Sequence, residues 1–148
     1  MTHGRIDLKI VADRLAIVSF CVTAMRRLPA SHLEEFEADW RNAAAADSLL
    51  RRAIEALFDT ARHVLAKAFG LGPLEYREVA RLAAEKELVT DPGLQSRLRE
   101  IAGFRNRLTH FYDEVTAEEI VGVVRDELGD LEALAEQLRI AATRLSQA

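Results

Sequence analysis

The stretch LLRRAIEALFDTARHVLAKAFG, residues 49–70, indicates the fold class of this 148-residue chain. Its apolar side chains recur three and four residues apart, which is the spacing of one face of an α-helix. The predicted stripe consists of Leu50, Ile54, Leu57, Phe58, Ala61 and Leu65. We expect this helix to begin near Asp39 and to end at Phe69, because glycines and a proline follow directly. A helix of this length needs other helices to cover it.

The same spacing recurs along the rest of the chain, where capping and turn residues divide it into helices. A first helix is stopped by Pro29, and Ser31 with Glu34 forms a capping-box pattern for a short helix. Asp91 followed by Pro92 predicts an N-cap and a first helical residue. The predicted helices cover residues 5–28, a short segment after Ser31, residues 39–69, residues 74–89, residues 91 to 109 or 112, and one last helix from the Thr116 cap to Leu145.

The organisation of the chain is that of one domain. No linker, repeat or low-complexity tract divides residues 1–148, and glycines and prolines are few. Short connections between long helices favour antiparallel neighbours. We therefore expect an all-α protein, an up-and-down antiparallel bundle of four main helices plus shorter helices.

The charge balance limits the kind of partner that this chain can bind. Its net charge is −4, which argues against a broad basic surface for nucleic acid, so any RNA contact requires a local patch. Of the 20 basic residues 17 are arginines, and guanidinium forks suit phosphate and carboxylate groups. The richness in arginine and alanine equally fits a GC-rich genome, and both interpretations stay open.

The single cysteine and its surroundings bear on the cellular compartment. Cys21 lies inside the apolar run Leu15 to Met25, which predicts a buried structural thiol rather than a nucleophile. Eleven residues are too few to span a bilayer, and charged residues flank the run on both sides. We therefore expect a cytoplasmic protein without a membrane partner.

The stretch FRNRLTHFY, residues 104–112, gives the predicted fifth helix an unusually polar end. At about 100° per residue, Arg105 and Tyr112 lie at the edge of the core face. The far side carries Arg99, Gly103, Asn106 and His110. A glycine on a polar face often indicates close approach of a ligand or of another backbone, although a neutral surface glycine is the alternative.

Two relations within this stretch concern its possible chemistry. Asn106 and His110 are four residues apart, so the amide can hydrogen-bond the imidazole, although a solvated polar face is the commoner outcome. Arg105 and His110 are five apart, so on an ideal helix their directions differ by about 140°. They could come together in three ways: the long arginine side chain could extend toward the histidine, the helix could loosen at its end, or two chains could share one site.

Residues 105–112, RNRLTHFY, match the R-x-x-x-x-H-x-Y signature of HepT-like proteins in the HEPN superfamily of small helical ribonucleases. The polar residue after the arginine, Asn106, fits the same pattern. The flanks resemble the family too, in AIEALFDTARHVLAKAFG (53–70), LEYREVARLAAEKELV (74–89) and the run through YDEVTAEEIVGVV. The chain therefore resembles this family over most of its length and is expected to share its HEPN-like fold.

The resemblance implies a metal-independent endoribonuclease toxin of a HEPN/MNT toxin–antitoxin pair, without metal or other cofactor. Arg105 and His110 would be the catalytic residues, with Asn106 in support. Attack by the ribose 2′-hydroxyl would leave a 2′,3′-cyclic phosphate, with His110 moving protons and Arg105 stabilising the charge on phosphorus oxygens. Arg99 and Arg107 are candidates for contacts with RNA phosphates.

The same resemblance implies two protein partners. Two copies of the chain would form a homodimer whose motifs face one cleft. A MntA-like minimal nucleotidyltransferase would serve as the antitoxin and transfer AMP to Tyr112. The bulk and negative charge of AMP beside Arg105 would exclude RNA phosphate. A half-buried tyrosine that caps the core is the structural alternative for Tyr112.

Other interpretations stay open at this point. The chain could be the non-catalytic substrate-binding subunit of a two-component nucleotidyltransferase, or a dimerisation module without activity. Asp59 and His63, four apart on the long helix, are expected to form an intrahelical pair, with a supporting role at the site as the alternative. No base-reading motif identifies the RNA target.

Overall fold

The computed structural model describes residues 4–73, 75–110 and 115–148. Every regular element within these ranges is an α-helix, so the predicted all-α class is confirmed. The helices are α1 (Leu8–Met25), α2 (Leu33–Ala38), α3 (Trp40–Phe69), α4 (Tyr76–Glu85), α5 (Pro92–Thr109), α6 (Ala117–Asp126) and α7 (Leu128–Ser146).

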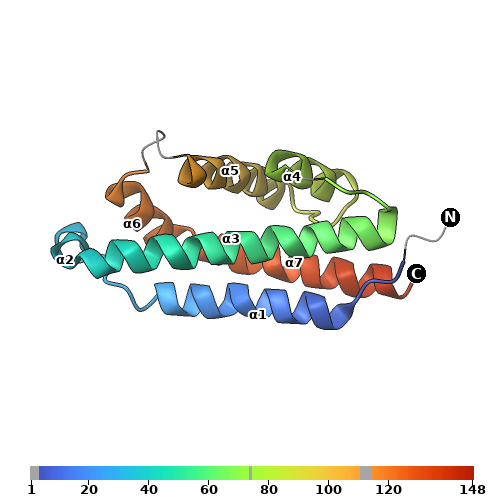
Figure 1. Cartoon of the computed structure of the whole chain (residues 1–148), viewed down its shortest axis with the longest axis horizontal. Helices are drawn as coiled ribbons and strands as arrows, with labels where there is room; N and C mark the ends of the chain where they lie inside the picture. The colour runs from blue at the N-terminus through green and yellow to red at the C-terminus, as the bar shows by residue number, and fades with distance from the viewer. Residues whose placement is uncertain (1–3, 74, 111–114) are drawn as a thin grey trace.

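The four longest helices, α1, α3, α5 and α7, run alternately up and down along the long axis of the molecule (Figure 1). Helix α3 occupies the centre, where it contacts α1 and α7 on one side and α4 and α5 on the other. The described ends of the chain lie at the same end of the bundle. The predicted antiparallel bundle of four main helices with shorter additions is confirmed.

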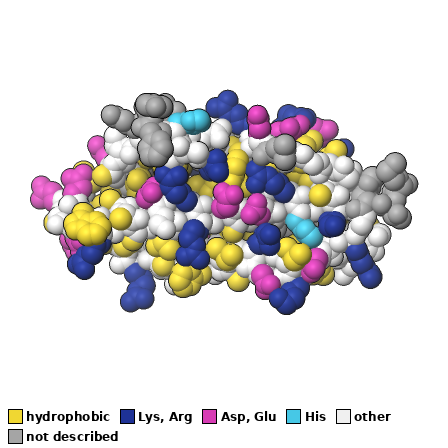
Figure 2. Space-filling view, viewed as in Figure 1, with side chains coloured by type: hydrophobic (Ala, Val, Ile, Leu, Met, Phe, Trp, Pro, Cys, Tyr) yellow, Lys and Arg dark blue, Asp and Glu magenta, His cyan; other side chains and the backbone are white. Residues whose placement is uncertain are grey.

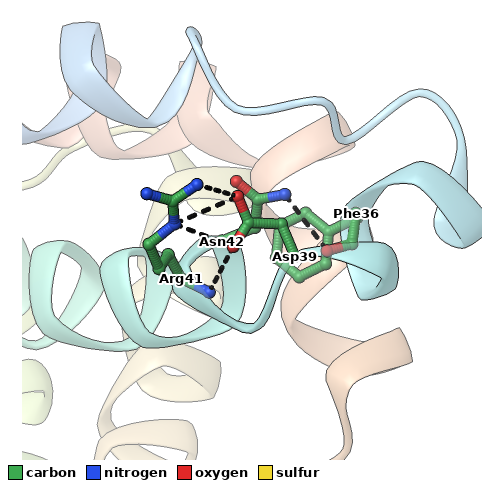
Figure 3. A network of polar contacts seen from close by, with 4 residues as sticks. All are labelled: Phe36, Asp39, Arg41 and Asn42. Carbon is green, nitrogen blue, oxygen red and sulfur yellow. Dashed lines mark hydrogen bonds and ion pairs between the residues drawn. The ribbon is translucent and has the colours of Figure 1, made fainter.

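The start of α3 is fixed by a small polar network between α2 and α3 (Figure 3). The Asp39 carboxylate accepts a hydrogen bond from the backbone N–H of Arg41 at 3.0 Å, which makes it the N-cap. The Asn42 amide donates to the carbonyl oxygen of Phe36 at 3.1 Å, which ties the two helices together. The predicted capping box was wrong, because α2 begins after His32, whose side chain makes no capping hydrogen bond.

The end of α3 confirms the predicted stop. Gly70 adopts the left-handed conformation (φ 67°), which glycine adopts without steric cost. Its N–H donates to the carbonyl of Ala66 at 3.0 Å, and the N–H of Leu71 donates to that of Leu65 at 3.2 Å. This pattern satisfies the last carbonyls of the helix and turns the chain back toward α4.

The core runs along both sides of α3. Its predicted stripe is buried, and buried alanines at 46, 53 and 56 widen it. Cys21 is fully buried as predicted, and this burial raises the pKa of its thiol. No helix in the described part of the chain combines the length and the apolar character needed to cross a membrane.

The predicted single last helix is two helices, α6 and α7, which part at Glu127 (φ −119°, ψ 1°). Figure 1 shows α6 leaving the line of α7 and crossing toward α2. Arg97 of α5 forms ion pairs with Glu127 at 2.9 Å and with Asp130 at 2.8 Å, so it binds both sides of the break. The apolar spacing continues through the break, because Val124, Leu128 and Leu131 are all buried. Periodicity alone therefore could not reveal it.

The N-terminus of α1 depends on His63 rather than on the predicted intrahelical pair. Asp59 forms its ion pair with Arg62 at 3.1 Å, so the prediction of an Asp59–His63 pair was wrong. The Nε2 atom of His63 accepts a hydrogen bond from the backbone N–H of Asp7 at 2.9 Å. The Asp7 carboxylate in turn caps α1, which therefore begins at Leu8 and not at residue 5.

This contact predicts a pH-dependent stability. Burial, followed by the charge of Lys67, lowers the pKa of His63 below its ordinary value of 6.5. The neutral imidazole is the form that accepts the hydrogen bond, so the unfolded chain takes up the proton first as pH falls. The contribution of this contact to the free energy of unfolding should therefore be complete above pH 6.5 and should be lost as pH falls through the folded-state pKa of His63.

Urea unfolding between pH 5 and 8 tests this expectation for the parent and for His63→Gln, whose side-chain oxygen can accept without titrating. The variant should lose the part of the pH dependence that comes from His63. His32→Gln is the matched control and should keep the parent slope. Equal slopes for the parent and His63→Gln would contradict the assignment.

Candidate functional site

The site is built on α5, and side-chain hydrogen bonds fix both ends of this helix. Asp91 caps the start through a hydrogen bond from the N–H of Leu94 at 2.8 Å, and Pro92 is the first helical residue, as predicted. The helix ends at Thr109, the earlier of the two predicted ends. The carbonyl of Leu108 accepts a hydrogen bond from the Arg51 guanidinium of α3, which satisfies a group that the helix leaves unpaired.

His110 is the first residue beyond the helix. Its N–H still donates to the carbonyl of Asn106 at 3.3 Å, but its own backbone is extended (φ −91°, ψ 117°). The angle of about 140° that an ideal helix imposes between Arg105 and His110 therefore no longer applies. Both residues line one cleft within a single chain. The helix end is therefore loosened at His110, and the two residues share a cleft without a second chain.

The cleft has a volume of about 780 Å³ and lies between α3, α4 and the end of α5. Its lining contains four arginines and two glutamates: Arg62, Arg77, Arg105, Arg107, Glu55 and Glu75. The local excess of positive charge contrasts with the net charge of −4 for the whole chain. Among the described residues no cluster of three His, Cys, Asp or Glu side chains is placed to hold a metal ion.

Arg105 is held mainly by an aromatic ring. Its guanidinium carbon lies 4.2 Å from the centroid of the Tyr76 ring, well within the range of a cation–π contact. A guanidinium nitrogen lies 3.6 Å from a carboxylate oxygen of Glu55, an ion pair too long for a hydrogen bond. The Arg105 side chain is 29% exposed. The predicted place at the edge of the core is therefore the observed one.

Tyr76, the first residue of α4, lines the cleft. It is 7% exposed, its ring lies 4.7 Å from that of Phe58, and its hydroxyl donates a hydrogen bond to Glu55. Burial and this hydrogen bond raise the pKa of Tyr76, so its hydroxyl keeps its proton. The guanidinium of Arg62 lies 4.6 Å from the same ring centroid.

Sequence reasoning missed Glu55 and Tyr76. Glu55 and Arg62 are seven residues apart, so they share a face of α3, and this spacing was a signal for one polar strip. No comparable signal identified Tyr76, because its contact with Glu55 joins two helices across 21 positions of sequence.

Of the remaining predicted site residues, some line the cleft and others do not. Arg107 lines the cleft and forms a two-pronged ion pair with Glu119, at 2.8 and 2.9 Å, which lowers the pKa of that carboxyl. Asn106 lines the cleft, but its hydrogen bond with His110 joins the two backbones and is not the predicted amide–imidazole bond. Arg99 donates to the Ser96 hydroxyl at 3.1 Å and is not part of the cleft lining. Tyr112 lies outside the described residues.

A second hollow of about 580 Å³ adjoins the cleft, and Gly103 and Arg107 line both. Its floor is apolar, with Ile101 and Phe104 of α5 facing Leu50 of α3. Figure 2 shows hydrophobic side chains between α5 and α3, with basic and acidic side chains beside them. A Cβ atom added at Gly103 would meet no described atom within 4 Å beyond its own turn of helix, so no other part of the described chain approaches this glycine closely.

Comparison with known proteins gives consistent matches in sequence and in structure. A family model described as ribonuclease HepT-like matches residues 21–138. The mRNA nuclease HepT of Shewanella oneidensis is 27% identical over 124 residues, which are 83% of this chain and 91% of that protein. A tri-AMPylated HEPN toxin of Shewanella oneidensis in complex with MNT antitoxin superposes with a TM-score of 0.78 at 25% identity, covering 88% of this chain and 97% of that one. A toxin–antitoxin crystal structure with AMP-PNP gives a TM-score of 0.76 at 25% identity, with coverage of 87% and 97%.

The contact between Arg51 and the end of α5 leads to a stability prediction. Arg51→Met removes the donor to the Leu108 carbonyl, so the last turn of α5 should open more often. We expect the free energy of unfolding in urea to fall by about 1 kcal/mol and amide exchange to accelerate near residues 107–110.

Two control variants separate this contact from general effects of lost charge. Arg52→Met removes the neighbouring guanidinium, which lies 6.0 Å from the Phe20 ring, and should cost at most about 0.5 kcal/mol. Asp47→Asn removes only the exposed ion pair of Arg51 and should leave exchange at the end of α5 unchanged. Unaltered exchange in Arg51→Met would contradict the role of this hydrogen bond.

Proposed function

Because this chain belongs to the HepT-like ribonuclease family, we propose that it is an endoribonuclease toxin that cleaves RNA in the cleft between α3, α4 and α5. The observation that carries the proposal is the meeting of Arg105 and His110 in one cleft with an excess of arginine. A phosphodiester chain is polyanionic, and this cleft is the local basic patch that an acidic protein needs to bind it.

The proposed reaction is an internal transesterification. The ribose 2′-oxygen attacks the adjacent phosphorus, His110 accepts the proton of the hydroxyl, and the bond from phosphorus to the 5′-oxygen breaks. A protonated histidine, either His110 or its copy in a second chain, returns a proton to the leaving oxygen. Arg105 stabilises the charge on the remaining phosphorus oxygens. The products are a 2′,3′-cyclic phosphate and a 5′-hydroxyl, and the internal nucleophile requires no metal-bound water.

The supporting residues follow from their positions around the cleft. Asn106 and Arg107 line it, so we assign Asn106 to the support of His110 through the helix end and Arg107 to a neighbouring RNA phosphate. Arg107 would have to share its guanidinium with Glu119 in that role. Arg99 lies outside the cleft lining, so any contact that it makes with phosphate would involve RNA beyond the cleft.

We further propose two protein partners. A homodimer would bring two copies of the motif to one face, and a MntA-like nucleotidyltransferase would hold the toxin inactive by transferring AMP to Tyr112. The similarity to a tri-AMPylated HEPN toxin in complex with MNT antitoxin supports this regulation. Messenger RNA is the first substrate to test, because the curated relative is an mRNA nuclease. We place the activity in the cytoplasm, where such RNA is found.

The catalytic assignment predicts the effect of single substitutions. His110→Ala and Arg105→Ala should each lower cleavage of a single-stranded RNA at least about a hundredfold, because each removes a group that acts on the transition state. Cleavage by purified protein, free of any nucleotidyltransferase, is followed by gel electrophoresis with detection of cyclic-phosphate ends. His32→Ala changes an exposed histidine outside the cleft and should cleave like the parent. Parental cleavage by His110→Ala would refute the assignment.

The regulatory assignment predicts a change in mass. Co-expression with a MntA-like nucleotidyltransferase should add one or more AMP units to the parent chain, measured by intact-mass spectrometry, and should abolish its cleavage of RNA. Tyr112→Phe should remain unmodified and active under the same conditions. Modification of Tyr112→Phe to the same extent would assign the AMP to another residue.

A further inference from the structure

We propose that Tyr76 is a positioning residue that holds the guanidinium of Arg105 in the cleft, so that its donors meet an RNA phosphate. The inference rests on the proposed ribonuclease function and adds to it a residue outside the R-x-x-x-x-H-x-Y motif. It is carried by the contacts around one ring, which belongs to α4 and reaches side chains of α3 and α5.

The ring contacts both guanidinium groups, and its contact with Arg105 uses none of that residue's hydrogen-bond donors. The face of a tyrosine ring attracts a cation within about 6 Å of its centroid, and Arg105 and Arg62 lie at 4.2 and 4.6 Å. A stacked guanidinium leaves its N–H groups directed outward in its own plane. The Arg105 guanidinium donates no hydrogen bond to any described residue, so its donors remain available for phosphate oxygens.

The ring itself is fixed in place. Tyr76 is nearly buried, packs against Phe58 and donates its hydroxyl proton to Glu55. Because this hydroxyl stays protonated, the ring keeps its neutral form, in which it supports two cations. An arginine has a long, flexible side chain. A rigid support restrains this side chain before RNA binds, so less conformational entropy is lost on reaching the transition state.

Acidic neighbours offset part of the charge of the two arginines that contact the ring. Glu55 lies 3.6 Å from Arg105, and Asp59 lies 3.1 Å from Arg62, so each guanidinium has one carboxylate nearby. Without the ring, Arg105 would be free to close the long gap to Glu55 and form a direct ion pair with it. Its donors would then be turned away from the RNA, which would lower the rate of the chemical step more than the affinity.

The experiment measures kcat and KM for cleavage of a fluorescent single-stranded RNA by the full-length protein, purified without a nucleotidyltransferase. Tyr76→Leu should lower kcat at least about tenfold and change KM by less than about threefold, because Arg105 acts mainly in the transition state. Tyr76→Phe keeps the ring and should retain kcat within about threefold. The matched control is Phe69→Leu, which removes a ring that holds Lys86 at 5.6 Å outside the cleft, and should leave kcat unchanged.

A second series of variants tests the role of the ring even if Tyr76→Leu fails to fold. Phenylalanines with increasing numbers of fluorine atoms at position 76 preserve the shape of the ring and reduce the negative potential of its face. Under the proposal kcat should fall stepwise along this series. A kcat that does not vary along the series would overturn the positioning role, as would a loss in Tyr76→Phe equal to that in Tyr76→Leu.

The outcomes for the two proposals are distinct. A parent protein that cleaves RNA while the fluorinated series shows no trend contradicts only the role of Tyr76. A parent protein that fails to cleave any RNA contradicts the ribonuclease function itself, and the role of Tyr76 with it.

Discussion

Burial of α3 on both sides is the constraint on which the rest of the structure depends. A helix with apolar residues on opposite faces must be covered by α1 and α7 on one side and by α4 and α5 on the other. The narrow polar strip left between these layers carries Glu55 and Arg62, and the start of α4 and the end of α5 close over it. Core packing therefore determines which charged groups meet in the cleft.

The cleft also shows how an acidic protein can present a basic site. Its lining has four arginines and two glutamates, although acidic residues outnumber basic ones in the whole chain. Like charges in one cleft repel each other, and an aromatic ring is a neutral surface that attracts cations. Tyr76 fills that position, and the carboxylates of Glu55 and Asp59 offset part of the remaining charge. The arrangement holds the guanidinium of Arg105 without consuming its donors.

The sequence predicted the elements best where one local signal was decisive. The apolar spacing of α3, the Asp91 cap and the Gly70 stop were all found, because each depends on residues within a few positions of one another. The break at Glu127 was missed, because buried residues continue the helical spacing on both sides and the stabilising Arg97 comes from α5. The capping box at Ser31 failed because α2 begins one residue later, after His32.

The sequence by itself determined the all-α class and the motif that identifies the family. These properties follow from periodicity and short spacings, which the chain carries locally. Only the tertiary structure decided that Arg105 and His110 share one cleft, because α3, α4 and the end of α5 pack together to form its walls. It also decided that Tyr76 supports Arg105, since packing of α4 and α5 against α3 brings together groups that no local spacing relates.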